Sequence, residues 1–174
     1  MSDNPTRALP DISYLHRLFL LEEDGRLRRR ISQSKYKAGT YAGSINAWGH
    51  LKVRIGGVFI YAHRIVWAMT YGKWPEKSLD HINGIKTDNR PENLREATDL
   101  ENNHNVGIRK TNSTGYRGVS VDRRRNAFQA QITVNGKHQY LGHFKTPEEA
   151  SVAYENAARA FHGEFYRTPE NSNV

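Results

Sequence analysis

The chain has 174 residues, and its 26 lysines and arginines outnumber its 18 aspartates and glutamates, giving a formal net charge of +8 at pH 7. This basic excess favours a polyanionic partner such as nucleic acid. The absence of cysteine excludes disulfides, thiolate zinc sites, cysteine nucleophiles and iron–sulfur clusters. No apolar run approaches the ~20 residues that span a bilayer, and the amino terminus has no apolar signal region. We therefore expect a soluble cytoplasmic protein without a membrane partner.

The amino-terminal part predicts a loose arm, a short helix and a hairpin. Residues 1–10 are polar and contain two prolines, which is typical of a flexible arm. Asp11 or Ser13 can cap a short helix, and Asp24-Gly25 is typical of a two-residue hairpin turn. The basic stretch 32–43 has no hydrophobic period, so we expect it to form a loop.

Two strands and a helix are predicted next. Residues 49–55 alternate between apolar and basic side chains, Gly56-Gly57 is typical of a turn, and residues 58–61 return as a second strand. The apolar residues of 62–71 recur at helical spacing, and Gly72 is a suitable helix end. This stretch therefore predicts a hairpin followed by a helix.

The densest group of polar side chains lies in residues 79–106. The pattern predicts a strand that ends at His81, a turn-rich loop over 83–92 and a short returning strand over 93–95. A capping-box pattern then opens a helix over about 99–106. The expected order is strand, loop, strand, helix.

Four side chains in this segment suggest metal-assisted chemistry on a phosphate. The Asp80 carboxylate and the Asn102 amide oxygen are ligands that suit a hard divalent cation such as Mg²⁺. The His81 imidazole titrates near neutral pH and can accept a proton from water. The Asn93 amide can fix the loop or orient the histidine. The alternative is that these polar residues only form turns on the surface.

The same segment resembles HNH nucleases of the phage and intron homing-endonuclease type. The resemblance rests on AHRIVWAMTYGKWP, LDHINGIKTDNRPENLREAT and ENNHN, which follow one another in this order. It covers residues 40–106 well and the first 40 residues weakly, and the family's ββα-metal motif corresponds to 79–106. The resemblance implies a DNA endonuclease that hydrolyses a phosphodiester bond with one divalent metal ion, Mg²⁺ or alternatively Mn²⁺.

The resemblance also implies a role for each of the four residues. His81 would be the catalytic general base that activates water. Asp80 and Asn102 would bind the metal ion that bridges the scissile phosphate. Asn93 would be the middle residue of the motif. It would belong to the catalytic residues because it holds the loop and supports His81.

Two assignments stay open at this point. His104 and Asn105 are alternatives to Asn102 as the metal ligand, because all three lie within one helical turn. His63, which precedes Arg64, is expected to be a packed structural histidine rather than a catalytic one.

The carboxy-terminal part predicts a compact module that follows a polar linker over 107–114. Asn135-Gly136 is typical of a hairpin turn between two strands. Thr146 can cap a helix that begins at Pro147 and ends at Gly163, and the helix carries an alanine-rich stripe that extends to Phe161. The predicted strands are 116–121, 127–134 and 138–144, and the predicted helix is 147–162.

This module resembles the DNA-binding domain of the Apetala-two/ethylene-response-factor type through YRGV, FQAQI, YLGHF, TPEEA and AARAFHG. The resemblance implies a three-stranded antiparallel sheet packed on one helix, with the sheet laid in the major groove of DNA. Ser120, Gln131 and Thr133 depart from the plant family's pattern, so the plant target sequence is not carried over. The candidate DNA-binding residues are Arg117, Arg123, Arg124, Arg125, Gln131, Thr133, His138 and Tyr140.

Together these patterns predict an α+β protein with two modules that acts on double-stranded DNA. The expected function is a metal-dependent HNH endonuclease with site preference, acting as a nicking or homing enzyme. It is expected to act as a monomer, in the bacterial host cytoplasm if it comes from a phage. The alternative is a non-catalytic DNA-binding regulator that retains a degenerate nuclease fold. The predicted boundaries are an arm over 1–10, a nuclease region over 11–106, a linker over 107–114, a DNA-binding domain over 115–167 and a tail over 168–174.

Overall fold

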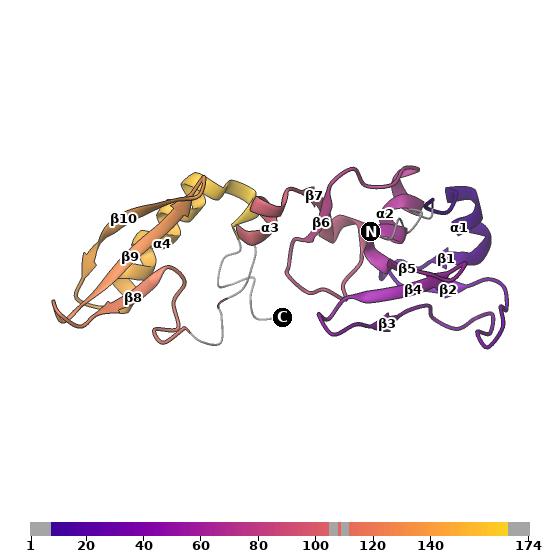
Figure 1. Cartoon of the computed structure of the whole chain (residues 1–174), viewed down its shortest axis with the longest axis horizontal. Coiled ribbons are helices and arrows are strands. Elements are labelled where there is room, and N and C mark those ends of the chain that lie inside the picture. Colours follow the sequence, from indigo (N-terminus) through magenta and orange to yellow (C-terminus); the bar gives the residue numbers. More distant parts are fainter. Residues whose placement is uncertain (1–7, 105–107, 109–111, 167–174) are drawn as a thin grey trace, which may run out of the picture. The chain divides into compact units, whose positions relative to one another are not determined.

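The computed structural model describes residues 8–104, 108 and 112–166, which form the predicted mixed α+β fold (Figure 1). The chain divides into two compact units, one up to Asp99 and one from Leu100 onward, and each is described by itself. The predicted arm, linker and tail lie wholly or partly outside the described residues and stay predictions. No helix in the described part of the chain is long and apolar enough to cross a membrane.

The first unit opens with the predicted short helix and hairpin. Helix α1 (Ile12–Leu18) begins after Asp11, whose carboxylate accepts a hydrogen bond of 2.8 Å from the backbone N–H of Ser13. Strands β1 (Phe19–Leu21) and β2 (Leu27–Arg29) follow and pair antiparallel.

The turn between β1 and β2 requires a glycine. Gly25 has a φ of +77°, which side chains other than glycine rarely adopt. A Cβ at this position would lie 2.3 Å from the backbone nitrogen of Arg90 and from the backbone carbon of Asn89. The hairpin turn therefore packs directly against the backbone of residues 89–90.

A three-stranded antiparallel sheet and a helix complete this part of the unit. The strand order is β3 (Ser44–Ile45), β4 (Leu51–Ile55) and β5 (Val58–Tyr61). Helix α2 (Ala62–Tyr71) follows β5 directly and ends at Gly72, which has a φ of +68°. The predicted strands and helix are confirmed, whereas β3 was not among the predicted elements.

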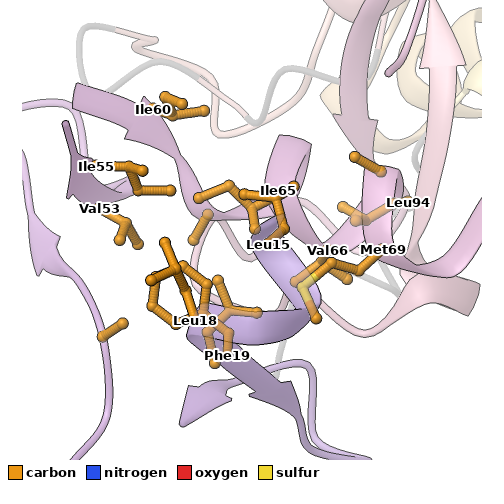
Figure 2. Packing of buried hydrophobic residues seen from close by; sticks show 14 residues of the cluster. Leu15, Leu18, Phe19, Val53, Ile55, Ile60, Ile65, Val66, Met69 and Leu94 are labelled. Atoms are coloured by element: carbon orange, nitrogen blue, oxygen red, sulfur yellow. The ribbon is translucent and has the colours of Figure 1, made fainter. Parts of the chain in front are cut away.

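One apolar core joins α1, β1, β2, β4, β5, α2 and Leu94 of the first unit, and Figure 2 shows its packing. The apolar positions of β4 alternate as predicted: Val53 and Ile55 are buried, whereas Arg54 is exposed. Helix α2 covers this face because its own apolar residues recur at helical spacing. The labelled members of the core are Leu15, Leu18, Phe19, Val53, Ile55, Ile60, Ile65, Val66, Met69 and Leu94.

A two-stranded ribbon and a short helix complete the predicted strand–loop–strand–helix order. Strand β6 (Ser78–His81) pairs antiparallel with β7 (Leu94–Ala97). A short 3₁₀ turn (Pro91–Asn93) leads directly into β7. Helix α3 (Asp99–His104) follows, and the predicted helical residues 105–106 lie outside the described part of the chain.

The second unit has the predicted sheet and helix (Figure 1). Strands β8 (Val119–Asp122), β9 (Ala127–Val134) and β10 (Lys137–Phe144) pair antiparallel in the order β10-β9-β8. Helix α4 (Pro147–His162) packs against them. Its amino terminus has the predicted capping box, in which the side chains and backbones of Thr146 and the third helical residue bond to each other.

The apolar face of α4 differs from the prediction at its carboxy-terminal end. Ala150, Tyr154 and Ala158 are buried against the sheet as expected, but Phe161 is 51% exposed. After the helix ends at Gly163 the chain turns back, and Tyr166 packs beside Tyr154 with ring centroids 6.2 Å apart. The inclusion of Phe161 in the buried stripe was therefore wrong, because Tyr166 contributes the aromatic ring at this end of the core.

Candidate functional site

The polar site of the first unit lies at the end of strand β6. Asp80 and His81 are both buried, at 8% and 4% exposed. In the ribbon Asp80 lies opposite Arg95 and His81 lies opposite Leu94. Consecutive strand residues point to opposite faces, so the two side chains enter different surroundings.

The carboxylate of Asp80 is held by an arginine on the neighbouring strand. Arg95 donates hydrogen bonds from Nε at 2.9 Å and from Nη2 at 2.8 Å, and both reach Oδ2 of Asp80. The two side chains are only 9% and 14% exposed, so water screens this ion pair weakly. The strand that contains Arg95 was predicted from the sequence, whereas the ion pair was not.

The imidazole of His81 is oriented by a buried amide. Its Nε2 lies 3.0 Å from Oδ1 of Asn89, which is 2% exposed. Because an amide oxygen only accepts hydrogen bonds, Nε2 carries the proton and Nδ1 is the basic nitrogen of the neutral ring. Burial lowers the pKa of His81 below its ordinary value, although the hydrogen bond to Asn89 opposes this shift. The ring is therefore neutral at pH 7, in one fixed tautomer.

Asn93 organises the loop that carries Asn89. Its Nδ2 donates to Oδ1 of Asn83 at 3.0 Å and to the backbone oxygen of Asp88 at 2.8 Å. Its Oδ1 accepts a hydrogen bond of 3.0 Å from the backbone N–H of Asn83. Asn93 thus ties both ends of the loop together and fixes the residue before Asn89, whereas Asn89 itself contacts His81.

An ion pair further stabilises the same loop. Arg90 donates to both carboxylate oxygens of Asp88, from Nε at 2.9 Å and from Nη2 at 2.8 Å. Asn83 donates to Oδ2 of Asp88 at 2.7 Å. These hydrogen bonds lower the pKa of Asp88 to about 2, and the bond from Arg90 has the largest effect. The carboxylate is therefore ionised wherever the protein is folded near neutral pH.

Two more histidines lie beside His81. The ring centroids of His50, His63 and His81 are 5.1 to 5.6 Å apart. Tyr61 stacks on His63 with an interplanar angle of 11°. Burial lowers the pKa of His50 to about 4 and that of His63 to about 3. His63 was predicted to be a structural histidine and His50 was not predicted to belong to a site, because no short-range motif connects the three residues.

The predicted helical ligand lies in α3. Asn102 is half-buried there, and its partnership with Asp80 stays a prediction. His104, the first alternative, is the last residue of α3. Asn105, the second alternative, lies outside the described residues.

In the second unit, four of the predicted DNA-binding residues share the outer face of the sheet. Gln131 lies opposite Tyr140, and Thr133 lies opposite His138. All four are exposed, and Oγ1 of Thr133 lies 3.0 Å from Nδ1 of His138. Alternation along β9 explains this, because Ile132 between them points into the core.

Basic residues and a polar hollow adjoin this face. Arg123, Arg124 and Arg125 are exposed in the turn that joins β8 to β9. Nε2 of His143 lies 2.9 Å from Oδ2 of Asp122, and Nδ1 lies 3.1 Å from Nη1 of Arg125. The hollow has a volume of about 490 Å³ and is lined by Asp122, Arg124, Arg125, Gln129 and His143.

Arg117 lies elsewhere than the other predicted DNA-binding residues. Its guanidinium lies 5.9 Å from the centroid of the Tyr166 ring, and Tyr166 packs with Tyr154 of α4. Arg117 is half-buried in this position. It therefore lies on the helix side of the sheet, and a DNA contact by Arg117 stays a prediction.

Comparisons with known proteins address the polar site of the first unit. A family model described as HNH endonuclease matches residues 60–104. Protein 3.8 of Escherichia phage T7 is 30% identical over 106 residues, which are 60% of this chain and 87% of that protein. The chain belongs to the HNH endonuclease family. HNH endonuclease L560 of Acanthamoeba polyphaga mimivirus is 31% identical over 105 residues, which are 59% of this chain and 54% of that protein.

A solved structure titled as DNA binding and cleavage by the HNH homing endonuclease I-HmuI is also similar. Its TM-score is 0.40 at 18% identity, with 81% of this chain and 79% of that chain covered. The HNH match contains His63, both strands of the ribbon and α3, but it excludes His50 and the sheet of the second unit. The protein is thus an HNH endonuclease, an enzyme class that generally uses a divalent metal ion.

Proposed function

We propose that this HNH endonuclease hydrolyses a DNA phosphodiester bond with His81 as the general base and a divalent metal ion, Mg²⁺ or alternatively Mn²⁺, as the cofactor. The observation that carries the proposal is the buried, neutral His81, whose tautomer is set by Asn89 and which lies inside the HNH match. A base held in one tautomer and one orientation presents the same nitrogen to every attacking water.

The proton of the attacking water passes to Nδ1 of His81 in this mechanism. The bond from Nε2 to Asn89 keeps the ring in the tautomer that has its basic nitrogen at Nδ1. The lowered pKa of His81 keeps the ring unprotonated, so the base is ready at neutral pH. Asn93 acts as a positioning residue, because it fixes the loop that presents Asn89.

Asp80 and Asn102 are the residues proposed to hold the metal ion. Their carboxylate and amide oxygens are the hard ligands that Mg²⁺ prefers. Two hydrogen bonds from Arg95 reach Oδ2 of Asp80, which holds the Asp80 side chain in a defined orientation. When bound, the ion supplies stabilisation of the negative charge that develops on the phosphate.

The second unit is proposed to bind double-stranded DNA through its outer sheet face. The proposal is supported by the exposed polar residues on that face and by the adjacent arginines. The resemblance to the Apetala-two type of domain suggests that the sheet enters the major groove. Direct readout of bases would then fall to Gln131 and Thr133, with Tyr140 and His138 across the strand pair.

The experiment that tests the proposal is incubation of the protein with supercoiled plasmid DNA and either MgCl₂ or MnCl₂, each with and without EDTA. We expect open-circular product with the metal ion and none with the chelator. His16→Ala serves as the matched control for a substitution of the proposed base His81, because His16 is an exposed histidine on α1. Binding to DNA without any cleavage in either metal ion would contradict the nuclease proposal and favour a DNA-binding regulator.

A further inference from the structure

We propose that His50, His63 and His81 form a second metal site, which takes a late first-row transition ion such as Zn²⁺ and thereby withdraws His81 from base catalysis. Each histidine offers one ring nitrogen, and the three nitrogens lie within 4.8 Å of one another. Binding by this site is independent of the nuclease chemistry, whereas the inhibitory consequence rests on the proposed function.

The site is assembled from three separate segments of the first unit. His50 directly precedes β4, His63 lies in the first turn of α2, and His81 ends β6. Each segment belongs to or borders a regular element, so the three rings are held by the fold rather than by one flexible loop. A preorganised set of ligands loses little conformational entropy when an ion binds.

Two of the histidines each bury a ring nitrogen. Nδ1 of His50 and Nδ1 of His63 are buried without a hydrogen-bond partner among the described residues. An unpaired buried polar atom costs free energy, and natural proteins tolerate few of them. Coordination of an ion by these rings would offset this cost. It would also explain why two neighbouring histidines both have an unpaired buried nitrogen among the described residues.

The third histidine already has the outer-shell contact that metal-binding histidines usually show. A coordinating imidazole typically donates its other ring N–H to a carbonyl or carboxylate oxygen, which fixes the tautomer. Nε2 of His81 has this partner in Oδ1 of Asn89, so Nδ1 is its ligand nitrogen. This is the same Nδ1 that the proposed mechanism requires as the base, and one lone pair cannot serve both purposes.

The geometry requires only a small adjustment for a tetrahedral ion. Zn–N bonds of about 2.0–2.1 Å place the nitrogens about 3.3 Å apart. Separations within 4.8 Å must therefore close by at most about 1.5 Å. Small rotations of three ring-bearing side chains can supply this, and three protein ligands leave the fourth position to water.

Ligand chemistry separates this site from the proposed Mg²⁺ site. Three imidazole nitrogens suit Zn²⁺, Co²⁺, Ni²⁺ and Cu²⁺, whereas Mg²⁺ prefers the oxygens of Asp80 and Asn102. The nearby carboxylates of Asp80 and Asp88 offset the positive charge of an ion at His81. Two cations oppose the ion: Lys86, which acts on His50 and His81, and Arg64, which acts on His63. The Nζ of Lys86 donates to the backbone oxygen of Trp48 at 2.9 Å.

Binding is tested with Co²⁺ on the full chain, without DNA. We expect the intense visible absorption of tetrahedral Co²⁺, which equimolar Zn²⁺ removes. His50→Ala and His63→Ala should each weaken Co²⁺ binding at least 10-fold, and Asn89→Ala should weaken it about 10-fold through the outer shell. His16→Ala should leave it unchanged, because His16 is exposed on another element. Thermal unfolding of each variant verifies that it is folded. If the other variants fail to fold, the Co²⁺ affinity of His50→Ala alone tests the site, because His50 is half-buried.

Equal Co²⁺ affinity in the wild type and His50→Ala, or no tetrahedral spectrum at all, would overturn the site.

The proposed inhibition of cleavage is tested by adding Zn²⁺ to cleavage reactions at constant Mg²⁺, with each rate normalised to the same protein without Zn²⁺. We expect inhibition of the wild type at a Zn²⁺ concentration at least 10-fold below that needed for His50→Ala. Stimulation by Zn²⁺ would refute the inhibitory role. A Co²⁺ spectrum without any Mg²⁺-dependent cleavage would instead refute the proposed function while leaving the site intact.

Discussion

At the scale of single residues, the alternation of strand β6 separates two kinds of chemistry. Asp80 points toward Arg95 of the neighbouring strand, whereas His81 points toward Asn89 and two further histidines. The carboxylate is paired with an arginine, whereas the imidazole is hydrogen-bonded to a neutral amide and lies beside two further histidine rings. Substitutions at the two positions should therefore have different consequences, although the residues are adjacent in sequence.

His81→Ala should lower the cleavage rate by about 100- to 10,000-fold, the usual loss when a general base is removed. Affinity for DNA should stay within a few-fold of the wild type, because phosphate contacts elsewhere supply most of the binding free energy. Single-turnover cleavage and equilibrium binding to the same duplex measure the two effects. A variant that cuts within a few-fold of the wild type would remove His81 from the base role.

Asp80→Ala and Asn102→Ala should both raise the Mg²⁺ concentration required for half-maximal cleavage. The effect of Asp80→Ala should be larger, because it removes a charge as well as a ligand. It also removes the carboxylate that pairs with the half-buried Arg95, so a lower melting temperature is expected for this variant alone. A magnesium titration of the rate measures each midpoint. A shift for His104→Ala or Asn105→Ala, with none for Asn102→Ala, would reassign the helical ligand.

The chemistry of the site could be anticipated from sequence only where the residues form a local pattern. Asp80, His81 and Asn93 lie within 14 residues, and their types and spacing pointed to a site. Asn89 lies in the same loop but was read as a turn former, because nothing in the sequence shows that it is buried against a histidine. His50 and Arg95 reach the site only through strand pairing and packing, which a linear pattern does not display.

At the scale of elements, the loop between β6 and β7 is held by side chains rather than by a regular ladder. Asn93 and Asp88 make most of its described internal hydrogen bonds, and both lie close to Asn89 in sequence. The orientation of His81 therefore depends on the stability of this loop. Weakening the loop should affect the folded state first and the chemistry second.

Asp88→Asn should destabilise the protein at pH 7 by about 1 kcal/mol, a discounted value because Arg90 is 46% exposed. The pKa of Asp88 is about 2 in the folded state and near 3.8 in the unfolded chain. Its ionised form therefore stabilises the fold fully at a pH above the pKa of the unfolded chain, and this contribution is lost as the pH falls from about 4 to 2.

Urea unfolding at several pH values measures this effect. The difference in free energy of unfolding between wild type and variant should shrink over the same pH range. Glu23→Gln is the control, because Glu23 is an exposed carboxylate outside this loop. A difference that does not change with pH would contradict the assignment.

The helices were the most predictable elements because their ends are encoded locally. Asp11, Gly72 and Thr146 each occupy the cap position expected from their residue type. Strand β3 was not predicted, because two residues carry no period and form a strand only by pairing with β4. Phe161 was wrongly placed in the core for a similar reason, since the return of the chain to Tyr166 is not visible in the helical pattern.

At the scale of the whole molecule, each unit has its own apolar core. The core of the first unit is built from residues between Ile12 and Leu94. The clusters of the second unit are built from residues between Tyr116 and Tyr166. The described clusters of the two units share no residue, so we expect the first unit to fold without the sheet of the second.

A chain that ends at Asn112 should therefore keep Mg²⁺-dependent cleavage but lose much of its affinity and site preference. Residues 109–145 contain eight basic residues and one acidic residue, and removing most of them removes phosphate contacts. Binding to specific and random duplexes at several salt concentrations should give a shallower salt dependence for the shortened chain. If both chains discriminate equally between the duplexes, sequence preference belongs to the first unit.

The nuclease is expected to act as a monomer that nicks one strand per binding event. The chain has one Asp80-His81 pair, and one base positions one water in line with one phosphate. The second scissile phosphate lies on a strand of opposite polarity, so cutting both strands needs a second copy or a large reorientation. Helix α4, the longest helix in the described part of the chain, covers its own sheet with Ala150, Tyr154 and Ala158, so this face is not available to a symmetric partner.

A supercoiled plasmid with one preferred site distinguishes nicking from double-strand cleavage. Open circles should accumulate first, and linear DNA should appear only late or at high protein concentration. Mass measurement in solution, with and without a duplex, should give one copy per site at the concentrations used for cleavage. Immediate linear product together with a dimer mass would refute the monomeric nickase. Immediate linear product with a monomer mass would instead require one active site to reorient between the strands before the protein dissociates.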